Sequence, residues 1–246
     1  FWLKTLPVKS MIQPLSRALL MGRKARKLAS RGAQHSKTLT GAENPAASLG
    51  SVPSRVLLLR HGQSEANRTG DDLPDTLLSE LGVLQASAWR GQIGSLGAEV
   101  VLVSPLRRAV QTACLAYQDD AVPLELCRPA REMWWEESQN QPGPARALSQ
   151  LLERLPHGQE LMHQVDEAVN AGPDEPASEA ESIEQLRTIL VARPESRVAV
   201  VCHWGVINSL CGASANNCQV LECAFNQTGC LRVVDSHSPP GVRKTI

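Results

Sequence analysis

The chain of 246 residues has few aromatic side chains, no long apolar run and no excess of either charge. No stretch approaches the roughly 18 consecutive apolar residues that a membrane span requires. Basic and acidic residues number 25 each, so the overall balance implies no nucleic-acid partner. Aromatic residues make up only 3%, which makes the neighbours Trp134 and Trp135 notable, either as an aromatic wall for an organic substrate or as core and rim residues. A composition of 42% hydrophobic and 20% charged residues is typical of a globular enzyme domain with one core.

The cysteines do not form a recognisable metal or disulfide pattern. None of the seven lies in a CxxC pair, and Cys211, Cys218, Cys223 and Cys230 are spaced too widely for an ordinary zinc knuckle or ribbon. The odd number also argues against a complete disulfide framework. We therefore expect reduced thiols, no metal, and an intracellular protein rather than a secreted one.

The charge is distributed unevenly along the chain. Residues 1–40 carry nine Lys or Arg and no acidic residue, which leaves 16 basic against 25 acidic residues in the remainder. We expect 1–54 to be a basic N-terminal extension, either a disordered tail, an organellar transit peptide or untranslated sequence included in the chain, and 55–246 to be a catalytic domain. A transit peptide would direct the protein to a plastid or mitochondrion, and without one the cytoplasm is expected.

Two apolar segments end abruptly on a histidine. Residues 55–59 lead into Arg60 and His61, and residues 197–202 lead into His203. Buried strands of a parallel sheet deliver reactive side chains to their carboxyl ends in this way. Two such strands predict a single site that contains both imidazoles.

The side chains near these histidines favour phosphoryl chemistry. Neutral imidazole is a nucleophile near physiological pH, and Arg60 can bind phosphate oxygens with two hydrogen bonds. A third apolar segment ends at Ser104, and Pro105 is placed to begin a helix whose first turn contains Arg107. Phosphate groups bind well at such helix starts, so we expect Arg107 to be the second phosphate-binding guanidinium. Arg108 and Arg131 are expected to be surface charges or structural ion-pair partners.

A cluster of positive groups would depress the pKa of His61 and keep it nucleophilic. The leaving oxygen then needs a proton, and a carboxylic acid beside the phosphate anion would have the raised pKa of a general acid. Glu132 is the leading candidate for this role, with Glu136 and Glu137 as alternatives nearby in the sequence.

Strand and helix patterns alternate through most of the chain. They predict an α/β fold with three layers, α/β/α, around a mostly parallel central sheet. Strands are expected at 55–59, 99–103, 122–126, 197–202 and 231–235, and the main helices at 81–93, 106–117, 145–155, 181–191 and 206–211. The acidic segment 156–179, rich in Gly, Pro and Ala, is expected to be a mobile excursion near the site.

The four ordered elements around His61, Ser104, Glu132 and His203 resemble the histidine phosphatase superfamily, whose best-known members are the phosphoglycerate mutases. The resemblance extends from about residue 56 to 234. It implies a phosphohistidine on His61, protonation of the departing alcohol by Glu132, and no cofactor. The positions that match the family's phosphate-holding residues are Arg60, Arg107 and His203, with Gln63 and Asn67 in accessory places.

The resemblance leaves three function classes open. A metal-independent phosphomonoesterase acting on a small phosphorylated metabolite or a phosphoprotein is favoured. A phosphoglycerate mutase or sugar bisphosphatase is the second, although a Trp-containing segment and a proline-rich insertion typical of the glycolytic mutases are missing. The third is a non-catalytic phosphate-binding protein. The oligomeric state does not follow from the sequence.

Overall fold

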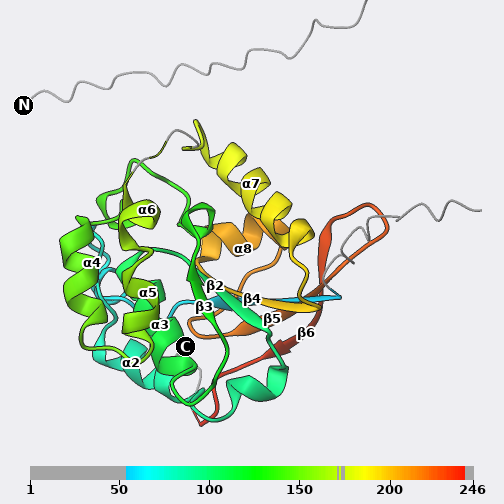
Figure 1. Cartoon of the computed structure of the whole chain (residues 1–246), viewed down its shortest axis with the longest axis horizontal. Helices are drawn as coiled ribbons and strands as arrows, with labels where there is room; N and C mark the ends of the chain where they lie inside the picture. Colours follow the sequence, from blue (N-terminus) through cyan, green and yellow to red (C-terminus); the bar gives the residue numbers. More distant parts are fainter. Residues whose placement is uncertain (1–53, 171, 173–174, 242–246) are drawn as a thin grey trace, which may run out of the picture. The chain divides into compact units, whose positions relative to one another are not determined.

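The computed structural model describes residues 54–170, 172 and 175–241, which fold around a central six-stranded sheet (Figure 1). The strands lie in the order β3-β2-β4-β1-β5-β6. Strand β5 runs opposite to the other five strands, which confirms the mostly parallel sheet. The strands are β1 (Arg55–Arg60), β2 (Val100–Val103), β3 (Leu124–Leu126), β4 (Arg197–Cys202), β5 (Val220–Phe225) and β6 (Leu231–His237).

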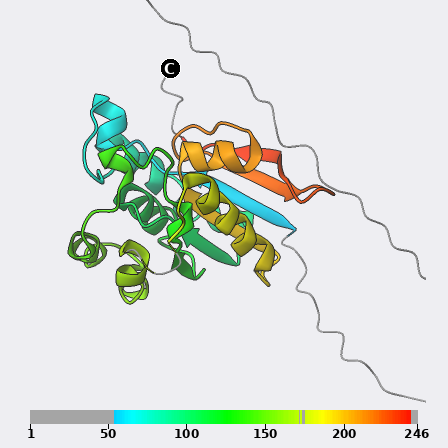
Figure 2. The same cartoon turned by 90° about the horizontal axis from the view of Figure 1, so that it is seen from above.

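Helices cover both faces of this sheet, which confirms the three-layer architecture. The α-helices are α1 (Glu65–Thr69), α2 (Glu80–Ser87), α3 (Arg107–Ala116), α4 (Ala145–Leu152), α5 (Gly158–Met162), α6 (Val165–Val169), α7 (Glu179–Ala192) and α8 (Trp204–Cys211). Three short 3-10 helices are η1 (Ile93–Leu96), η2 (Arg128–Ala130) and η3 (Ser138–Asn140). The long helix α7 and helix α8 lie side by side in both views (Figure 1, Figure 2).

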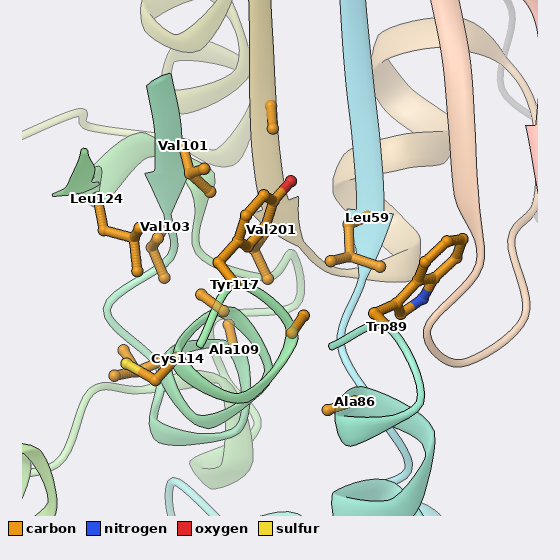
Figure 3. Packing of buried hydrophobic residues seen from close by; sticks show 14 of the residues in the cluster. Leu59, Ala86, Trp89, Val101, Val103, Ala109, Cys114, Tyr117, Leu124 and Val201 are labelled. Carbon is orange, nitrogen blue, oxygen red and sulfur yellow. The ribbon is translucent and has the colours of Figure 1, made fainter. Parts of the chain in front are cut away.

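The sheet divides the buried apolar side chains into two cores, because successive residues of a strand point to opposite faces. In β1, Leu57 and Leu59 pack with helices α2 to α6, whereas Val56 and Leu58 pack with α7 and α8. Figure 3 shows the first core, to which Leu59 and Val201 of the central strands contribute together with Trp89 and Tyr117. This burial on both faces explains why the central strands are continuous apolar runs.

Two expectations about local structure are wrong. The segment 156–179 contains helices α5 and α6, and Leu161 and Val165 are buried in the first core. Each of the two short helices therefore contributes a buried apolar side chain that binds the segment to the core despite its Gly and Pro content. Strand β5 was also not expected, and it is the antiparallel neighbour of β1.

Some predictions fall on parts of the chain outside the described residues. Residues 1–53 are among them, so the N-terminal extension and its transit peptide stay predictions, as does the division into two regions. Within the described part of the chain, no helix is long and apolar enough to cross a membrane.

The order of the parallel strands brings the predicted site together. Strand β4 lies between β1 and β2, and all three run in the same direction. Their carboxyl ends therefore meet at one edge of the sheet. His61 follows β1, His203 follows β4, and Ser104 follows β2.

Candidate active site

His61 is held in one orientation by the backbone around it. Its ring Nδ1 lies 2.6 Å from the carbonyl oxygen of Gly62, which can only accept, so Nδ1 carries the proton. Its Nε2 accepts a hydrogen bond from Arg108 Nε at 3.4 Å, so this nitrogen carries the lone pair. A β-carbon at position 62 would lie 2.6 Å from the backbone oxygen of Gly82, so only glycine fits next to His61.

The surroundings of His61 keep its imidazole neutral. The residue is only 3% exposed, and this burial lowers its pKa well below the usual range. The positive charges of Arg108 and Arg60 lower the pKa further. A neutral imidazole with an oriented Nε2 lone pair is the form that a nucleophile requires.

His203 lies at the start of helix α8, directly after β4, and its ring centroid is 5.0 Å from that of His61. Its Nε2 is 2.7 Å from Ser104 Oγ, and that hydroxyl also accepts a hydrogen bond from the backbone N–H of Leu106 at 3.4 Å. The Ser104 hydroxyl can donate to Nε2 or accept from it, and the proton of His203 is on Nδ1 in the tautomer in which Ser104 donates. That Nδ1 is buried and has no hydrogen-bond partner among the described residues.

Burial also lowers the pKa of His203 well below its usual range, with Arg108, His61 and Arg60 contributing in the same direction. A buried donor without a partner costs roughly 1–3 kcal/mol. The Nδ1 of His203 is therefore available for a ligand group that enters the site.

Arg60 contributes a second unpaired donor. Its Nη1 donates to the carbonyl oxygen of Ala215 at 2.8 Å, which fixes the guanidinium. Its Nε is buried and, like His203 Nδ1, has no partner in the described part of the chain. Burial lowers the pKa of Arg60, and the negative charge of Glu132 acts in the opposite direction.

The structure corrects the placement of the two adjacent arginines. The side chain of Arg107 is bound by Asp75, with Nε 2.8 Å from the backbone oxygen and 3.2 Å from the carboxylate. Arg108 instead lies beside His61, is only 3% exposed, and donates to the backbone oxygen of Gln139. The expectation of a surface charge at Arg108 is therefore wrong. Burial lowers the pKa of its guanidinium to about 10, so it remains charged at neutral pH.

The periodicity of helix α3 could have indicated from the sequence that Arg108, and not Arg107, faces the site. Arg108 and Thr112 are four residues apart and share the buried face of the helix. The Thr112 hydroxyl donates to the backbone oxygen of Arg108 and accepts from the backbone N–H of Gly62. Arg107 lies on a different, partly exposed face of the helix.

Glu132 lies beside the start of α8. Its Oε1 accepts hydrogen bonds from the backbone N–H groups of Gly205 at 3.0 Å and Met133 at 2.9 Å. Burial raises the pKa of Glu132, and these N–H groups together with Arg108 and Arg60 oppose the rise. Among the three carboxyl groups considered from the sequence, Glu132 is the buried one, because Glu136 is exposed and Glu137 is half-buried.

The two accessory positions have structural partners in this structure. Asn67 completes the capping box of α1, where its Oδ1 accepts from the backbone N–H of Ser64. Gln63 Oε1 accepts from the hydroxyl of Ser79 at 2.8 Å. Neither interaction involves the two histidines, so their phosphate-side roles stay predictions.

Sequence reasoning missed two residues that orient the site. Ser104 was considered only as the end of a strand, and its hydroxyl binds His203. Asn140 is buried and its Oδ1 accepts from Arg108 Nη2 at 2.9 Å. The Nδ2 of Asn140 donates to the backbone oxygens of Met133 and Trp134, so it also connects Arg108 to the segment of Glu132. Nothing in the sequence around Asn140 indicates this role.

Elsewhere in the described residues, one group of side chains has the composition of a metal site. Glu222, Asp235 and His237 lie together on β5 and β6 and include none of the residues named above. Glu222 is also paired with Arg55 at 3.0 Å, a neighbouring positive charge that disfavours a cation.

A cavity of about 770 Å³ lies beside β3. Its lining does not include His61, His203, Arg60, Arg108 or Glu132. The charged side chains that line it include the ion pairs Arg128–Glu175 and Arg193–Glu125. The chemistry described above is therefore separate from this cavity.

Solved structures of other proteins share this fold. A protein of Escherichia coli with the provisional name alpha-ribazole-5'-P phosphatase is 24% identical, with a TM-score of 0.52 over 76% of this chain and 99% of that chain. A mutant phosphoserine phosphatase of Entamoeba histolytica, in complex with phosphoserine, is 19% identical, with a TM-score of 0.50 over 76% and 98% of the two chains. The protein YhfR of Bacillus stearothermophilus is 16% identical, with a TM-score of 0.51 over 73% and 95%.

No curated protein sequence matches the chain. The family model of the histidine phosphatase superfamily, branch 1, matches residues 56–235, which contain both histidines, Arg60, Arg108 and Glu132. This range also agrees with the extent of the resemblance inferred from the motifs. The chain therefore belongs to branch 1 of the histidine phosphatase superfamily.

Proposed function

We propose that the protein is a phosphatase that hydrolyses phosphomonoesters through a phosphohistidine on His61, without a metal ion. The observation that carries this proposal is the environment of His61 Nε2, an oriented lone pair in a buried group of cations. Arg108 donates to that nitrogen, and the buried Nδ1 of His203 has no partner among the described residues. Such an arrangement suits an anion that brings its own acceptors into the site.

In the first half of the reaction, His61 Nε2 attacks phosphorus. The N–P bond forms as the P–O bond to the alcohol breaks, and the charge on the phosphoryl oxygens is stabilised by the Arg108 guanidinium, Arg60 Nε and His203 Nδ1. The Arg108 Nε–H that contacts His61 Nε2 has to turn to a phosphoryl oxygen when this nitrogen attacks, while the Gln139 oxygen and Asn140 hold the rest of the guanidinium in place. Arg108 therefore takes the phosphate-binding role that the sequence suggested for Arg107.

Glu132 serves as the general acid in this mechanism. Its raised pKa favours the protonated carboxyl, which can give its proton to the departing alkoxide. In the second half, water attacks the phosphohistidine, the N–P bond breaks, and the proton from water returns to the Glu132 carboxylate. Phosphate and the resting enzyme are the products.

The ion pair of Arg107 with Asp75 favours a phosphatase over a mutase. A mutase has to hold a bisphosphorylated intermediate and therefore needs additional cations near the site. Arg107, the nearest further arginine in this segment, is bound to Asp75 instead. Two of the similar structures also carry phosphatase names.

The nucleophile is tested by trapping the intermediate. Wild-type protein mixed with an aryl phosphate and denatured in alkali should carry one phosphate on the peptide containing His61, detected by mass spectrometry. The His61→Ala protein should carry none and lose at least about 10⁴-fold in kcat. Circular dichroism confirms that the fold is retained. Phosphate on another residue, or unchanged turnover, would refute the role of His61.

The acid is tested by comparing leaving groups. Glu132→Gln should lose roughly 10²-fold or more in kcat/KM on an alkyl phosphate, whose alkoxide needs a proton, and much less on p-nitrophenyl phosphate, whose phenolate does not. Glu136→Gln is the matched control, since that side chain is exposed. Equal losses on both substrates would disqualify Glu132 as the acid.

A further inference from the structure

Two tryptophans form an exposed stacked pair in a chain that has few aromatic residues. The residues Trp134 and Trp204 are 40% and 36% exposed, their ring centroids are 5.8 Å apart, and their ring planes differ by 18°. By contrast, Trp89 and Tyr117 are buried in the first core. An exposed aromatic pair loses the hydrophobic stabilisation that burial would give, so a binding role is a natural explanation.

This pair lies on the side of the site where the leaving group departs. Trp204 directly follows His203, and Trp134 follows Glu132 by two residues. A β-carbon on Gly205 would lie 2.8 Å from Trp134 Cζ3 and 2.6 Å from Glu132 Oε1. Gly205 is therefore the place where the indole and the proposed acid meet. The organic part of a substrate has to extend from the oxygen that Glu132 protonates, which brings it to these rings.

Both rings are held in place rather than left free. Trp204 Nε1 donates to Ser214 Oγ at 2.7 Å. Trp134 has a backbone φ of 58°, a conformation that is unusual for a bulky residue and stores strain. Its backbone oxygen accepts from Glu137 N at 3.0 Å and Asn140 Nδ2 at 3.2 Å, which maintains this conformation. Strain that orients an exposed indole toward the site is typical of a functional position.

The neighbouring Trp135 shows a different environment. The guanidinium of Arg131 lies 3.8 Å from its ring centroid, and its backbone N–H donates to Glu179 Oε1 at 2.9 Å. Arg131 is in turn paired with Glu175 at 3.0 Å, which confirms the structural ion-pair role expected for this arginine. Trp135 therefore has protein partners on its ring, whereas the rings of Trp134 and Trp204 stack on each other and stay open to solvent.

We propose that Trp134 and Trp204 form a stacking platform for the leaving group, and that the substrates are phosphomonoesters of alcohols bearing an aromatic or similarly flat apolar group. This proposal rests on the proposed function, because the platform would select among its substrates. A separation of 5.8 Å between the centroids is less than the roughly 7 Å that an inserted ring needs. The flat group therefore stacks on an outer face of the pair instead of between the two indoles.

The experiment compares phenethyl phosphate with ethyl phosphate. Both release an alkoxide that needs a proton, so the two esters differ mainly in the ring. Wild-type protein should have a higher kcat/KM for phenethyl phosphate. Trp134→Gly, which accepts the positive φ, and Trp204→Ala should each reduce this preference about threefold to tenfold, the range expected for losing one aromatic contact.

Two controls separate stacking from a structural defect. Trp204→Phe keeps a ring and should keep most of the preference. Leu84→Ala removes another exposed apolar side chain, on α2, and should leave both rates unchanged. If the Trp134→Gly and Trp204→Ala proteins lose the same factor on both esters, or the wild type has no preference, the platform is refuted.

Direct binding distinguishes this proposal from the proposed function. The affinity of each ester for the His61→Ala protein is measured by calorimetry, where no turnover occurs. Tighter binding of phenethyl phosphate that is lost in the His61→Ala, Trp134→Gly protein supports the platform even if the wild type hydrolyses neither ester. Equal affinities for the two esters would overturn the platform and leave the proposed phosphatase activity untouched.

Discussion

The two histidines occupy equivalent places at the ends of neighbouring parallel strands, yet their ring nitrogens have opposite roles. In His61 the proton is on Nδ1, facing the Gly62 oxygen, and the Nε2 lone pair faces Arg108. In His203, Nε2 is bound by Ser104, and the buried Nδ1 has no partner among the described residues. This difference supports the proposal that His61 is the nucleophile and that His203 is a hydrogen-bond donor to the phosphoryl group.

This difference comes from the residues that follow each strand. After β1 the chain turns at Gly62, whose carbonyl oxygen lies against the ring of His61 and selects its tautomer. After β4 the chain enters helix α8 with His203 at its start, where the ring reaches the hydroxyl at the end of β2. Identical side chains thus acquire different chemistry from their second hydrogen-bond partners.

The largest expected effect tests the histidine pair itself. His61→Ala should abolish phosphoenzyme formation, whereas His203→Ala should lower kcat by about 10²- to 10³-fold and still form a phosphoenzyme slowly, because only one donor to the phosphoryl oxygens is lost. Rapid-quench measurement of the amount of phosphoenzyme over time checks this prediction. Loss of the phosphoenzyme in both variants alike would remove the distinction between nucleophile and donor.

The adjacent arginines provide the next comparison, with two identical side chains one residue apart. Arg108→Ala should lower kcat/KM by about 10²- to 10³-fold, because it removes the cation beside His61 Nε2. Arg107→Ala should change kcat/KM less than about tenfold and reduce the free energy of unfolding by about 1 kcal/mol through loss of its bonds to Asp75. Steady-state kinetics and urea unfolding distinguish the two. A larger loss of kcat/KM in Arg107→Ala than in Arg108→Ala would instead support Arg107 as the phosphate-binding arginine, as expected from the sequence.

A smaller effect is expected at Ser104, which positions His203. Ser104→Ala should lower kcat/KM about tenfold or less, the value of one buried hydrogen bond, and weaken inhibition by inorganic phosphate by a similar factor. Ser104→Thr keeps the hydroxyl and should restore both. An Ala variant that loses stability but keeps its affinity for phosphate would indicate a packing role alone.

The smallest effect concerns the pH dependence of stability. Both histidines have a folded pKa below the unfolded value of about 6.5, so the unfolded chain binds protons first as the pH falls. Their contribution to stability is complete above pH 6.5 and is lost below it, by up to about 1.4 kcal/mol per pH unit for each histidine. His203→Gln should reduce this slope in urea unfolding between pH 7 and pH 5.5. An unchanged slope would contradict the buried neutral state.

The sequence predicted the central features of the fold because they follow from local rules. Continuous apolar runs at β1, β2 and β4 indicated buried parallel strands, and the polar residues that follow them marked the site edge. The sequence pattern does not predict strand β5. The segment of helices α5 and α6 is rich in Gly and Pro, a composition that predicts a mobile excursion instead of helices. Elements this short contain too few residues for apolar periodicity to distinguish a helix or strand from a loop.

The sequence by itself therefore determined the fold class, the family motifs and the identity of His61, His203 and Glu132 as candidates. Only the tertiary structure decided which nitrogen of His61 is protonated, which of two adjacent arginines contacts it, and that Asn140 binds this arginine. Motifs depend on residue types at short spacing, whereas these choices depend on contacts between segments 30 to 100 residues apart along the chain, such as Arg108 with Asn140 and Ser104 with His203. Such contacts exist only after the strands are ordered in the sheet.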